Sequence, residues 1–236
     1  MGADRKKRLL LIGGGGHCLS VLDTVLRMGV FSEICISDRN FPAGSEVMGC
    51  RVAGDDRVLP VLFSQGFELA FVAVGSIKST KKRRELYQLA QDSGFAFPNI
   101  IDPSAAVSER ACLGQGIFIG KNAVVNAGVK IGDMAIINSG AVIEHGCLVG
   151  DFTHVAVGAA VCGDTMLEED VFVGAGAVIA QEARIGKGCI IGAGSVVFGQ
   201  TAPNSLVRSP GGGRTFFLIP AAENQKHAFF QEKRAC

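Results

Sequence analysis

Three histidines and one aspartate lie in sequence settings that suit them for chemistry. His17 directly follows the glycines of residues 13–16, and Asp38 comes about twenty-five residues after the first of them. His145 and His154 lie nine residues apart in a later, glycine-rich part of the chain. An imidazole with a pKa of about 6.5 can take up a proton near neutral pH, so each histidine is a candidate base. What each side chain can reach depends on the element that carries it.

A repeat of six residues predicts the element that carries His145 and His154. From residue 107 onward every sixth residue is aliphatic, sixteen times in succession. The series is Val107, Leu113, Ile119, Val125, Ile131, Ile137, Ile143, Val149, Val155, Val161, Leu167, Val173, Ile179, Ile185, Ile191 and Val197. Four residues after each, up to Ser195, the side chain is small or is Val, except at Ile117. A period of six fits short strands joined by corners, with one large and one small side chain pointing inward from each strand.

This pattern resembles the hexapeptide repeat of left-handed parallel β-helices, in which three six-residue units form one triangular coil. Sixteen units predict about five coils stacked about 4.8 Å apart, with flat outer faces that are available for packing. Gly or Asn often follows the aliphatic residue, as at Gly114, Asn126 and Gly132. We expect these residues to adopt the positive φ of a tight corner.

The phase of the repeat places both histidines outside this prism. Ile143 and Cys147 are the inward positions around His145, and His154 immediately precedes the inward Val155. Neither histidine is therefore expected to be a buried, hydrogen-bonded core residue. Their separation is half of an eighteen-residue coil, so both can serve one site only if that site lies between neighbouring subunits.

The first hundred residues follow a different pattern, which predicts a small parallel α/β domain. Apolar stretches at 8–12, 34–37 and 69–74 are predicted strands, and apolar residues at helical spacing predict helices at 19–30 and 79–93. Gly13, Gly14 and Gly15 join the first strand to the first helix, where free N–H groups and the helix dipole favour an anion.

The residues that end the other two predicted strands point to a nucleotide. Asp38 follows the second strand, where a carboxylate suits a ribose hydroxyl, and Gly75 follows the third. A domain of about 100 residues is too short for the two halves of a dinucleotide fold. We expect a mononucleotide or nucleotide-sugar site, with a ligand-free glycine turn as the alternative.

Composition and charge bound the class of protein. The 236 residues carry a net charge of +1, which argues against nucleic-acid binding. Basic residues cluster at 5–8 and 78–84, which predicts a solvated terminus and a solvated helix face. Eight cysteines occur without a C-x-x-C pair, which favours reduced thiols. No apolar run is long enough for a signal peptide or a transmembrane helix, so we expect a cytoplasmic protein without membrane insertion.

The layout as a whole resembles the bacterial acetyltransferases of nucleotide-linked amino sugars, which are grouped with the sialic-acid O-acetyltransferases. These proteins join a truncated Rossmann-like domain to a left-handed β-helix. The resemblance covers about residues 8–208 and rests on four stretches. They are the glycine loop ending in His at 13–17, the strand at 71–75, the β-helix entry at 101–105, and 138–158, which holds Asn138-Ser-Gly-Ala-Val-Ile-Glu144-His145 and Asp151-Phe-Thr-His154-Val-Ala-Val-Gly158.

The resemblance implies a domain organisation and an activity. It implies a Rossmann-like nucleotide-sugar-binding domain at 1–100, a β-helix acyltransferase domain at 101–214, and a tail of unassigned role at 215–236. The implied enzyme of glycan biosynthesis transfers an acetyl group directly from acetyl-CoA to the amino group of a nucleotide-linked sugar. Acetyl-CoA is its co-substrate, no cofactor is tightly bound, no metal takes part, and the active clefts lie between the subunits of a homotrimer.

The resemblance also implies roles for individual residues. His145 matches the catalytic base, and Glu144 is the nearest acidic candidate to orient it, because Gly146 stands where the family has an acidic residue. The implied substrate-binding residues are Gly13, Gly14, Gly15, His17, Asp38, Gly75 and Asn138. The implied acetyl-CoA-binding residues are His154, Gly158, Gly174 and Arg208, although the loop at 208–214 departs from the family's Gly-x-Pro-Ala.

Three alternatives stay open at the level of sequence. One is O-acetylation of a sugar of the sialic-acid type. Another is a non-catalytic, nucleotide-binding trimeric scaffold, which would release no CoA. The third is a zinc enzyme on the same repeat, which needs three histidine ligands where the repeat supplies two.

Overall fold

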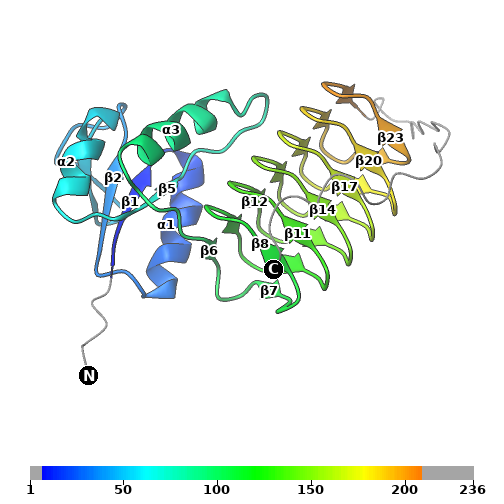
Figure 1. Ribbon diagram of the computed structural model, residues 1–236, viewed down its shortest axis with the longest axis horizontal. Helices are drawn as coiled ribbons and strands as arrows, with labels where there is room; N and C mark the ends of the chain where they lie inside the picture. Colours follow the sequence, from blue (N-terminus) through cyan, green and yellow to red (C-terminus); the bar gives the residue numbers. More distant parts are fainter. Residues whose placement is uncertain (1–6, 209–236) are drawn as a thin grey trace.

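The computed structural model describes residues 7–208, which form a small α/β domain packed against a three-sided β-helix (Figure 1). The α/β domain contains β1 (Arg8–Ile12), α1 (Gly16–Met28), β2 (Glu33–Ser37), β3 (Glu46–Val47), β4 (Cys50–Gly54), the 3-10 turn η1 (Asp56–Val58), α2 (Leu59–Ser64), β5 (Leu69–Val72) and α3 (Lys81–Asp92). Its sheet has the order β3-β4-β2-β1-β5 and is parallel except for the β3–β4 pair. The predicted parallel α/β domain is therefore confirmed.

The ends of these elements differ from the predicted ones for local reasons. Helix α1 begins at Gly16, directly after the extended Gly15, so the glycine loop leads straight into the helix. It ends at Met28 because Gly29 adopts a left-handed φ of 63°, which terminates a helix. β5 ends at Val72, and α3 spans 81–92. The β3–β4 hairpin and α2 are additions to the predicted pattern, because each is too short to show a clear periodicity.

From residue 100 onward the chain winds into strands of two residues each, which stack as three parallel sheets. The docking face consists of β6 (Ile100–Ile101), β9 (Phe118–Ile119), β12 (Ile136–Ile137), β15 (His154–Val155), β18 (Phe172–Val173), β21 (Ile190–Ile191) and β24 (Leu206–Val207). The aliphatic face consists of β7 (Ala106–Val107), β10 (Val124–Val125), β13 (Val142–Ile143), β16 (Ala160–Val161), β19 (Val178–Ile179) and β22 (Val196–Val197). The mixed face consists of β8 (Cys112–Leu113), β11 (Lys130–Ile131), β14 (Leu148–Val149), β17 (Met166–Leu167), β20 (Arg184–Ile185) and β23 (Gln200–Thr201).

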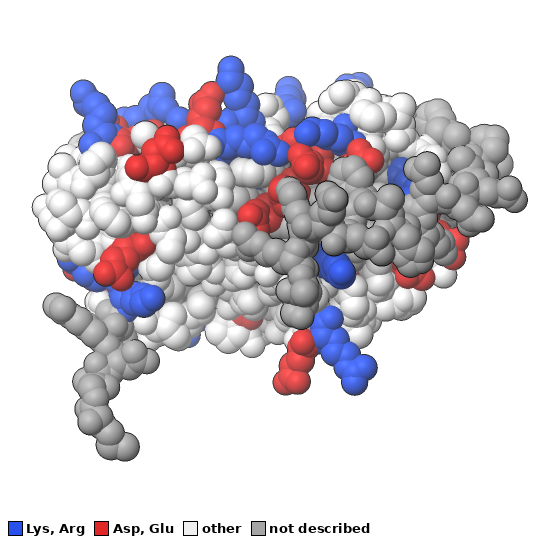
Figure 2. Space-filling view, in the orientation of Figure 1, with Lys and Arg blue, Asp and Glu red and all other residues white. Residues whose placement is uncertain are grey.

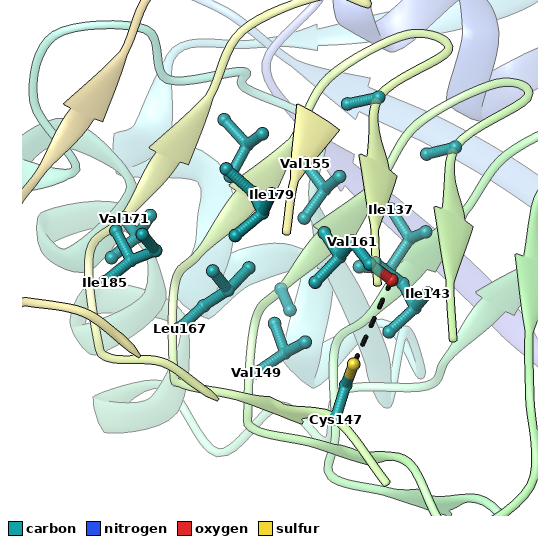
Figure 3. Packing of buried hydrophobic residues seen from close by; sticks show 14 of the residues in the cluster. Ile137, Ile143, Cys147, Val149, Val155, Val161, Leu167, Val171, Ile179 and Ile185 are labelled. Carbon is teal, nitrogen blue, oxygen red and sulfur yellow. Dashed lines mark hydrogen bonds between the residues drawn. The ribbon is translucent and has the colours of Figure 1, made fainter. Parts of the chain in front are cut away.

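The interior of the prism is filled as the repeat predicts. The aliphatic side chains from Ile119 to Ile191 are at most 3% exposed, and the small positions between them are equally buried. Figure 3 shows these side chains from all three faces converging on one core, with the Cys147 thiol directed at the carbonyl of Val161. The left-handed β-helix architecture is confirmed, and its apolar core needs no contribution from the α/β domain.

The strands of the prism extend beyond the sixteen repeat units at 107–197 at both ends and stay close to the predicted domain at 101–214. Ile101 lies six residues before Val107 and packs against the same core, so the repeat already begins in the β-helix entry at 101–105. After Val197 the next strand follows at an interval of four residues, through Gly199, before Val207 restores the spacing of six. This change of phase hides β23 and β24 from a search at a fixed period of six.

The expectation that the residue after each aliphatic position has a positive φ is wrong. Positive φ occurs two residues later, at Gly116, Asn122 and Gly128, and also at non-glycine corner residues such as Phe152. The glycine directly after the aliphatic residue is needed for space instead. A Cβ on Gly120 would lie 2.8 Å from the backbone N of Ser139 in the next coil, a distance that real Cβ atoms do not show.

The α/β domain is anchored to the docking face by its apolar core. Phe118 and Ile136, which point out of the prism, are at most 1% exposed because they join the core cluster that contains Val21 and Val25 of α1. Buried Asp102 accepts hydrogen bonds from Thr24 Oγ1 (2.9 Å) and Arg27 Nη1 (2.8 Å). The domain is thereby held in one orientation on the docking face.

The basic run at 78–84 is not simply a solvated helix face, which corrects the sequence-based interpretation. Arg84 of α3 donates to Asp170 of the β-helix (2.9 Å), and Arg83 is 1% exposed. Figure 2 shows Lys and Arg alternating with Asp and Glu along the upper edge of the view, over α3 and the adjoining coils. Lys82 and Arg84 of this run are therefore paired with anions.

Candidate functional site

The glycine loop and Asp38 form the rim of a pocket in the α/β domain. Gly13 has a φ of 103°, and a Cβ there would lie 2.5 Å from Val74 Cγ2, so only glycine fits. The backbone N–H of Gly14 donates to Asp38 Oδ2 (2.6 Å), and the N–H of Asn40 donates to Oδ1 (2.7 Å). Asp38 therefore ties the loop after β1 to the turn after β2. The N-terminus of α1 opens beside it without a side-chain cap, as an anion site requires.

The pocket has a volume of about 340 Å³. Five of the predicted substrate-binding residues line it: Gly13, Gly15, His17, Asp38 and Gly75. Gly14 belongs to the same loop, whereas Asn138 lies outside this pocket, on the β-helix.

The wall of this pocket also contains two cationic side chains that the sequence analysis did not predict as binding residues. Arg39 Nη2 and Lys82 Nζ lie 3.8 and 3.7 Å from Asp56 Oδ2, and all three residues line the pocket. A helix N-terminus with two cations nearby suits phosphate groups, and a carboxylate suits ribose hydroxyls. The signal for Lys82 was present in the basic run at 78–84, although its sequence does not indicate which of those residues faces a ligand.

His17 lies where the pocket meets the β-helix. Its ring packs edge-on against Phe118, with ring centroids 5.2 Å apart, and lies 6.3 Å from the ring of His154. Burial lowers the pKa of His17 to about 3, and the neighbouring His154 and Arg83 add to this effect. Within the described residues its enclosed Nε2 has no hydrogen-bond partner, and neither has Ser37 Oγ in the same pocket wall. Enclosed polar atoms without partners are commonly satisfied by a ligand or water.

His154 is buried, which corrects the expectation that neither β-helix histidine is a satisfied, enclosed residue. It does point out of the prism, but the α/β domain covers the docking face, and His154 is only 7% exposed. Its Nδ1 lies 2.8 Å from the carbonyl oxygen of Ser76 and its Nε2 lies 3.4 Å from Asn138 Nδ2. Burial lowers the pKa of His154 to about 4, with the nearby Arg83 also disfavouring the charged form. His154 is therefore a neutral imidazole at pH 7.

Asn138 combines a backbone role with a contact to this histidine. Its side-chain oxygen accepts from the N–H of Ser139 (2.8 Å), which shapes the corner after β12. Its Nδ2 faces His154 Nε2. Asn138 therefore stabilises its own corner, and the contact with His154 brings it within reach of the boundary between the domains.

Arg83 is a buried cation that joins the two domains at this point. Its guanidinium donates to the carbonyl oxygens of Met134 and Phe152 (3.1 Å for Phe152) and to Ser76 Oγ (3.4 Å). Burial lowers the pKa of Arg83 to about 10, so it stays charged at neutral pH. The carbonyl of Ser76 in turn contacts His154, so Arg83 fixes the loop that holds this histidine.

His145 lies on the opposite side of the prism, at the edge between the aliphatic and mixed faces. It occupies the turn between β13 and β14 and is exposed. Glu144 Oε2 accepts from Asn126 Nδ2 (3.0 Å) and from the backbone N–H of His145 (3.2 Å). The Glu144 carboxylate therefore holds the turn, and within residues 7–208 no hydrogen bond to the His145 ring is found.

The predicted acetyl-CoA-binding residues share a different edge. Gly158, Gly174 and Arg208 follow successive or nearby strands of the docking face, at its edge with the aliphatic face, and His154 lies on that docking face. Gly158 has a φ of 64°, and a Cβ there would meet nothing within 4 Å, so this corner is open to solvent. The structure thus separates His145 and the adjacent Glu144 from the predicted acetyl-CoA-binding residues by the width of the aliphatic face.

Two further observations concern metals and membranes. Nowhere in residues 7–208 do three His, Cys, Asp or Glu side chains gather in a way that could hold a metal ion. None of the helices in that range has the length and apolar character needed to cross a lipid bilayer.

Comparison with protein families assigns both parts of the chain. The PglD N-terminal domain family matches residues 8–89. The bacterial transferase hexapeptide family (six repeats) matches residues 164–199, and the hexapeptide repeat of succinyl-transferase matches residues 112–145. A search of curated proteins gave no match.

Solved structures extend these matches over most of the chain. The acetyltransferase domain of PglB from Neisseria gonorrhoeae, in complex with acetyl coenzyme A, is 34% identical and has a TM-score of 0.79, with 85% of this chain and 95% of that chain covered. PerB from Caulobacter crescentus, in complex with CoA and GDP-perosamine, is 33% identical with a TM-score of 0.59, and 85% and 91% are covered. WeeI from Acinetobacter baumannii shares the fold at 22% identity and a TM-score of 0.76, with 86% and 98% covered.

Proposed function

Because this chain belongs to the acetyl-CoA-dependent sugar acetyltransferases that join a PglD-type N-terminal domain to a hexapeptide-repeat β-helix, we propose that it N-acetylates an amino group on a nucleotide-linked sugar. The relative from Caulobacter crescentus was solved with CoA and GDP-perosamine, which is a sugar of this kind. In this chain, the pocket with Asp38, the open α1 N-terminus, Arg39 and Lys82 supplies partners for the ribose and phosphates. The assignment to a nucleotide-linked substrate rests on that pocket.

The exposure of His145 is the observation that carries the catalytic assignment. A general base works best when its pKa lies near the working pH. The pKa values of His17 and His154 are lowered to about 3 and 4, so both rings are very weak bases at neutral pH. Of the three histidines in the described residues, His145 is the exposed one. His17 and His154 are better suited to accept or donate hydrogen bonds as neutral groups.

In the proposed reaction the sugar amine attacks the thioester carbon of acetyl-CoA. The new C–N bond forms while the carbonyl oxygen becomes an oxyanion, and collapse of this intermediate breaks the C–S bond. His145 takes the proton that the attacking nitrogen loses, and that proton can pass to the departing CoA thiolate. The reaction yields an amide and free CoA.

The two edges of the aliphatic face, one with His145 and the other with Gly158, support a site that is shared between copies of the chain. The outward side chains of the aliphatic face are Ala106, Val124, Val142, Ala160, Val178 and Val196, whereas the mixed face carries Lys130 and Arg184. Three prisms that turn their aliphatic faces toward a common axis bring the His145 edge of each against the Gly158 edge of the next. The α/β domain of that neighbour would lie beside the same cleft. In such a homotrimer, His145 of one subunit lies beside the nucleotide pocket of its neighbour. The pocket of its own chain is on the far side of its own prism.

The experiment that tests this function measures CoA release with acetyl-CoA and a panel of nucleotide-linked amino and hydroxy sugars. We expect turnover with an amino sugar, and we expect His145→Ala to lower kcat by about 10²–10⁴. Gln181→Ala, at the same exposed repeat position two coils further along, is the matched control and should keep the wild-type kcat. Turnover of hydroxy sugars alone would contradict N-acetylation, and the absence of CoA release with every sugar would contradict catalysis.

A further inference from the structure

The His145 imidazole rests directly on a glycine of the next coil. Gly163 lies eighteen residues after His145, at the same edge of the prism and one coil further along. A Cβ built on Gly163 would lie 2.6 Å from Cε1 of the His145 ring, 2.7 Å from Nε2 and 3.2 Å from Nδ1. Real Cβ atoms do not approach other atoms closer than 3.0 Å, so this ring position exists only because residue 163 has no side chain.

The backbone does not explain the glycine. Gly163 is absent from the residues with positive φ, so its conformation is open to any residue. Ala127 occupies the equivalent position one coil before His145, and Ala175 and Ala193 occupy it at the edge between the docking and aliphatic faces. Alanine therefore fits this corner of the repeat. The atoms that a methyl group on residue 163 would meet are those of the His145 ring, and no backbone atom is among the three nearest.

Hydrogen bonding does not explain the orientation of the ring either. Glu144, the acidic neighbour, is engaged with the backbone N–H of His145 and with Asn126. No described side chain forms a hydrogen bond with either ring nitrogen. The contact with residue 163 is therefore what fixes the positions of those nitrogens.

We propose that Gly163 is a positioning residue for the reaction, because it provides the flat surface on which the His145 imidazole lies in its working orientation. This inference rests on the proposed role of His145 as the base. A methyl group at residue 163 would push Cε1 and Nε2, which would lie 2.6 and 2.7 Å from it, out to the 3.4 Å at which ordinary contact begins, and it would move Nδ1 by a few tenths of an ångström. A displacement of about 1 Å at a reacting group can cost about 10²-fold in rate.

The test is Gly163→Ala, measured in the wild-type protein and in the His145→Ala variant. In the wild-type background we expect kcat to fall by about 10²-fold, with the KM values for acetyl-CoA and the nucleotide sugar changed less than threefold. The thermal unfolding midpoint should stay within about 2 °C, because the exposed ring can swing into solvent and the corner accepts alanine. In the His145→Ala background the same methyl meets no ring, so kcat should change less than threefold.

The outcomes separate this inference from the function on which it rests. If His145→Ala lowers kcat but Gly163→Ala lowers it less than threefold, Gly163 does not position the base, and the inference is overturned while the function stands. It is also overturned if Gly163→Ala lowers kcat equally in both backgrounds, or if unfolding is shifted alike in both, because either result indicates a general structural effect. If His145→Ala itself keeps the wild-type kcat, the base assignment fails and the positioning role fails with it.

Discussion

The buried imidazole of His154 should make the folded protein sensitive to acid, and His154→Gln should remove the part of that sensitivity that His154 contributes. Burial lowers the pKa of His154 to about 4, whereas in the unfolded chain it is about 6.5. Below pH 6.5 the unfolded chain therefore binds a proton that the folded chain does not. Stability is fully present above about pH 6.5 and is lost progressively as the pH falls toward 4.

The size of the effect follows from the difference between these two pKa values. Each pH unit within the window changes the free energy of unfolding by about 1.4 kcal/mol. Lowering the pH from 7.5 to 5 should therefore cost about 2 kcal/mol through His154 alone. Glutamine cannot titrate, yet its amide can still donate to the carbonyl of Ser76, which His154 Nδ1 contacts at 2.8 Å. Most of the contribution of His17 remains in both proteins, because burial is the largest cause of its lowered pKa and the charge of His154 only adds to it.

The assay is chemical unfolding of both proteins at one protein concentration and several pH values between 7.5 and 5. We expect the difference in unfolding free energy between wild type and His154→Gln to change by about 2 kcal/mol across this range, in favour of the variant at low pH. Phe172→Leu is the matched control, because it trims the ring packed edge-on against His154 without removing a titrating group. Because His154 stays buried by its other neighbours in this variant, the cost of Phe172→Leu should vary with pH much less than that of His154→Gln. A wild-type-minus-variant difference that stays constant within about 0.5 kcal/mol would refute the neutral, enclosed state of His154.

Two other predictions concern the nucleotide pocket and the assembly. Asp38→Ala frees the N–H groups of Gly14 and Asn40 and removes a ribose partner, so nucleotide-sugar affinity should fall about tenfold to a hundredfold, corresponding to roughly 1.5–3 kcal/mol. Acetyl-CoA affinity should stay unchanged in the same calorimetric titrations, and an unaltered nucleotide-sugar affinity would place the nucleotide elsewhere. Val178→Glu puts a charge on the aliphatic face, so light scattering should show monomers with a native circular dichroism spectrum and little activity. An intact, active trimer would show that another face forms the interface.

The β-helix was predictable from sequence because its core repeats along one dimension. Each six-residue unit supplies one large inward side chain, so periodicity alone identifies the buried residues. The prediction stopped where the period changed, since the interval of four after Val197 breaks the phase although the strands continue. The prediction also explained the glycines after the aliphatic residues by a positive φ, whereas they are needed because a Cβ would clash with the next coil. A clash between neighbouring coils involves residues about eighteen positions apart, so it cannot be recognised within one six-residue unit.

The surroundings of His154 and Arg83 were not predictable from the period of six, because pointing out of the prism is not the same as facing solvent. A signal was nevertheless present at a period of eighteen. The outward residues of the docking face include Ile100, Phe118, Ile136 and Phe172, which are more apolar than those of the mixed face and larger than those of the aliphatic face. A row of this kind on one face indicates that another element covers it, and His154 lies within that row.

Each face and edge of the prism recurs every eighteen residues, so the consequence of a substitution depends on which row it enters. A charge in the row that contains Phe118, Ile136 and Phe172 would loosen the α/β domain, since these side chains pack against or beside it. A charge in the row of Val142 and Val178 would leave that domain in place and act on assembly. Bulk in the row of Ala127, His145 and Gly163 should spare both and act on the reaction. Under the proposed function, the anchoring of the nucleotide-binding domain, assembly and proton transfer depend on separate rows, and assembly brings the His145 row of one subunit to the α/β domain of the next.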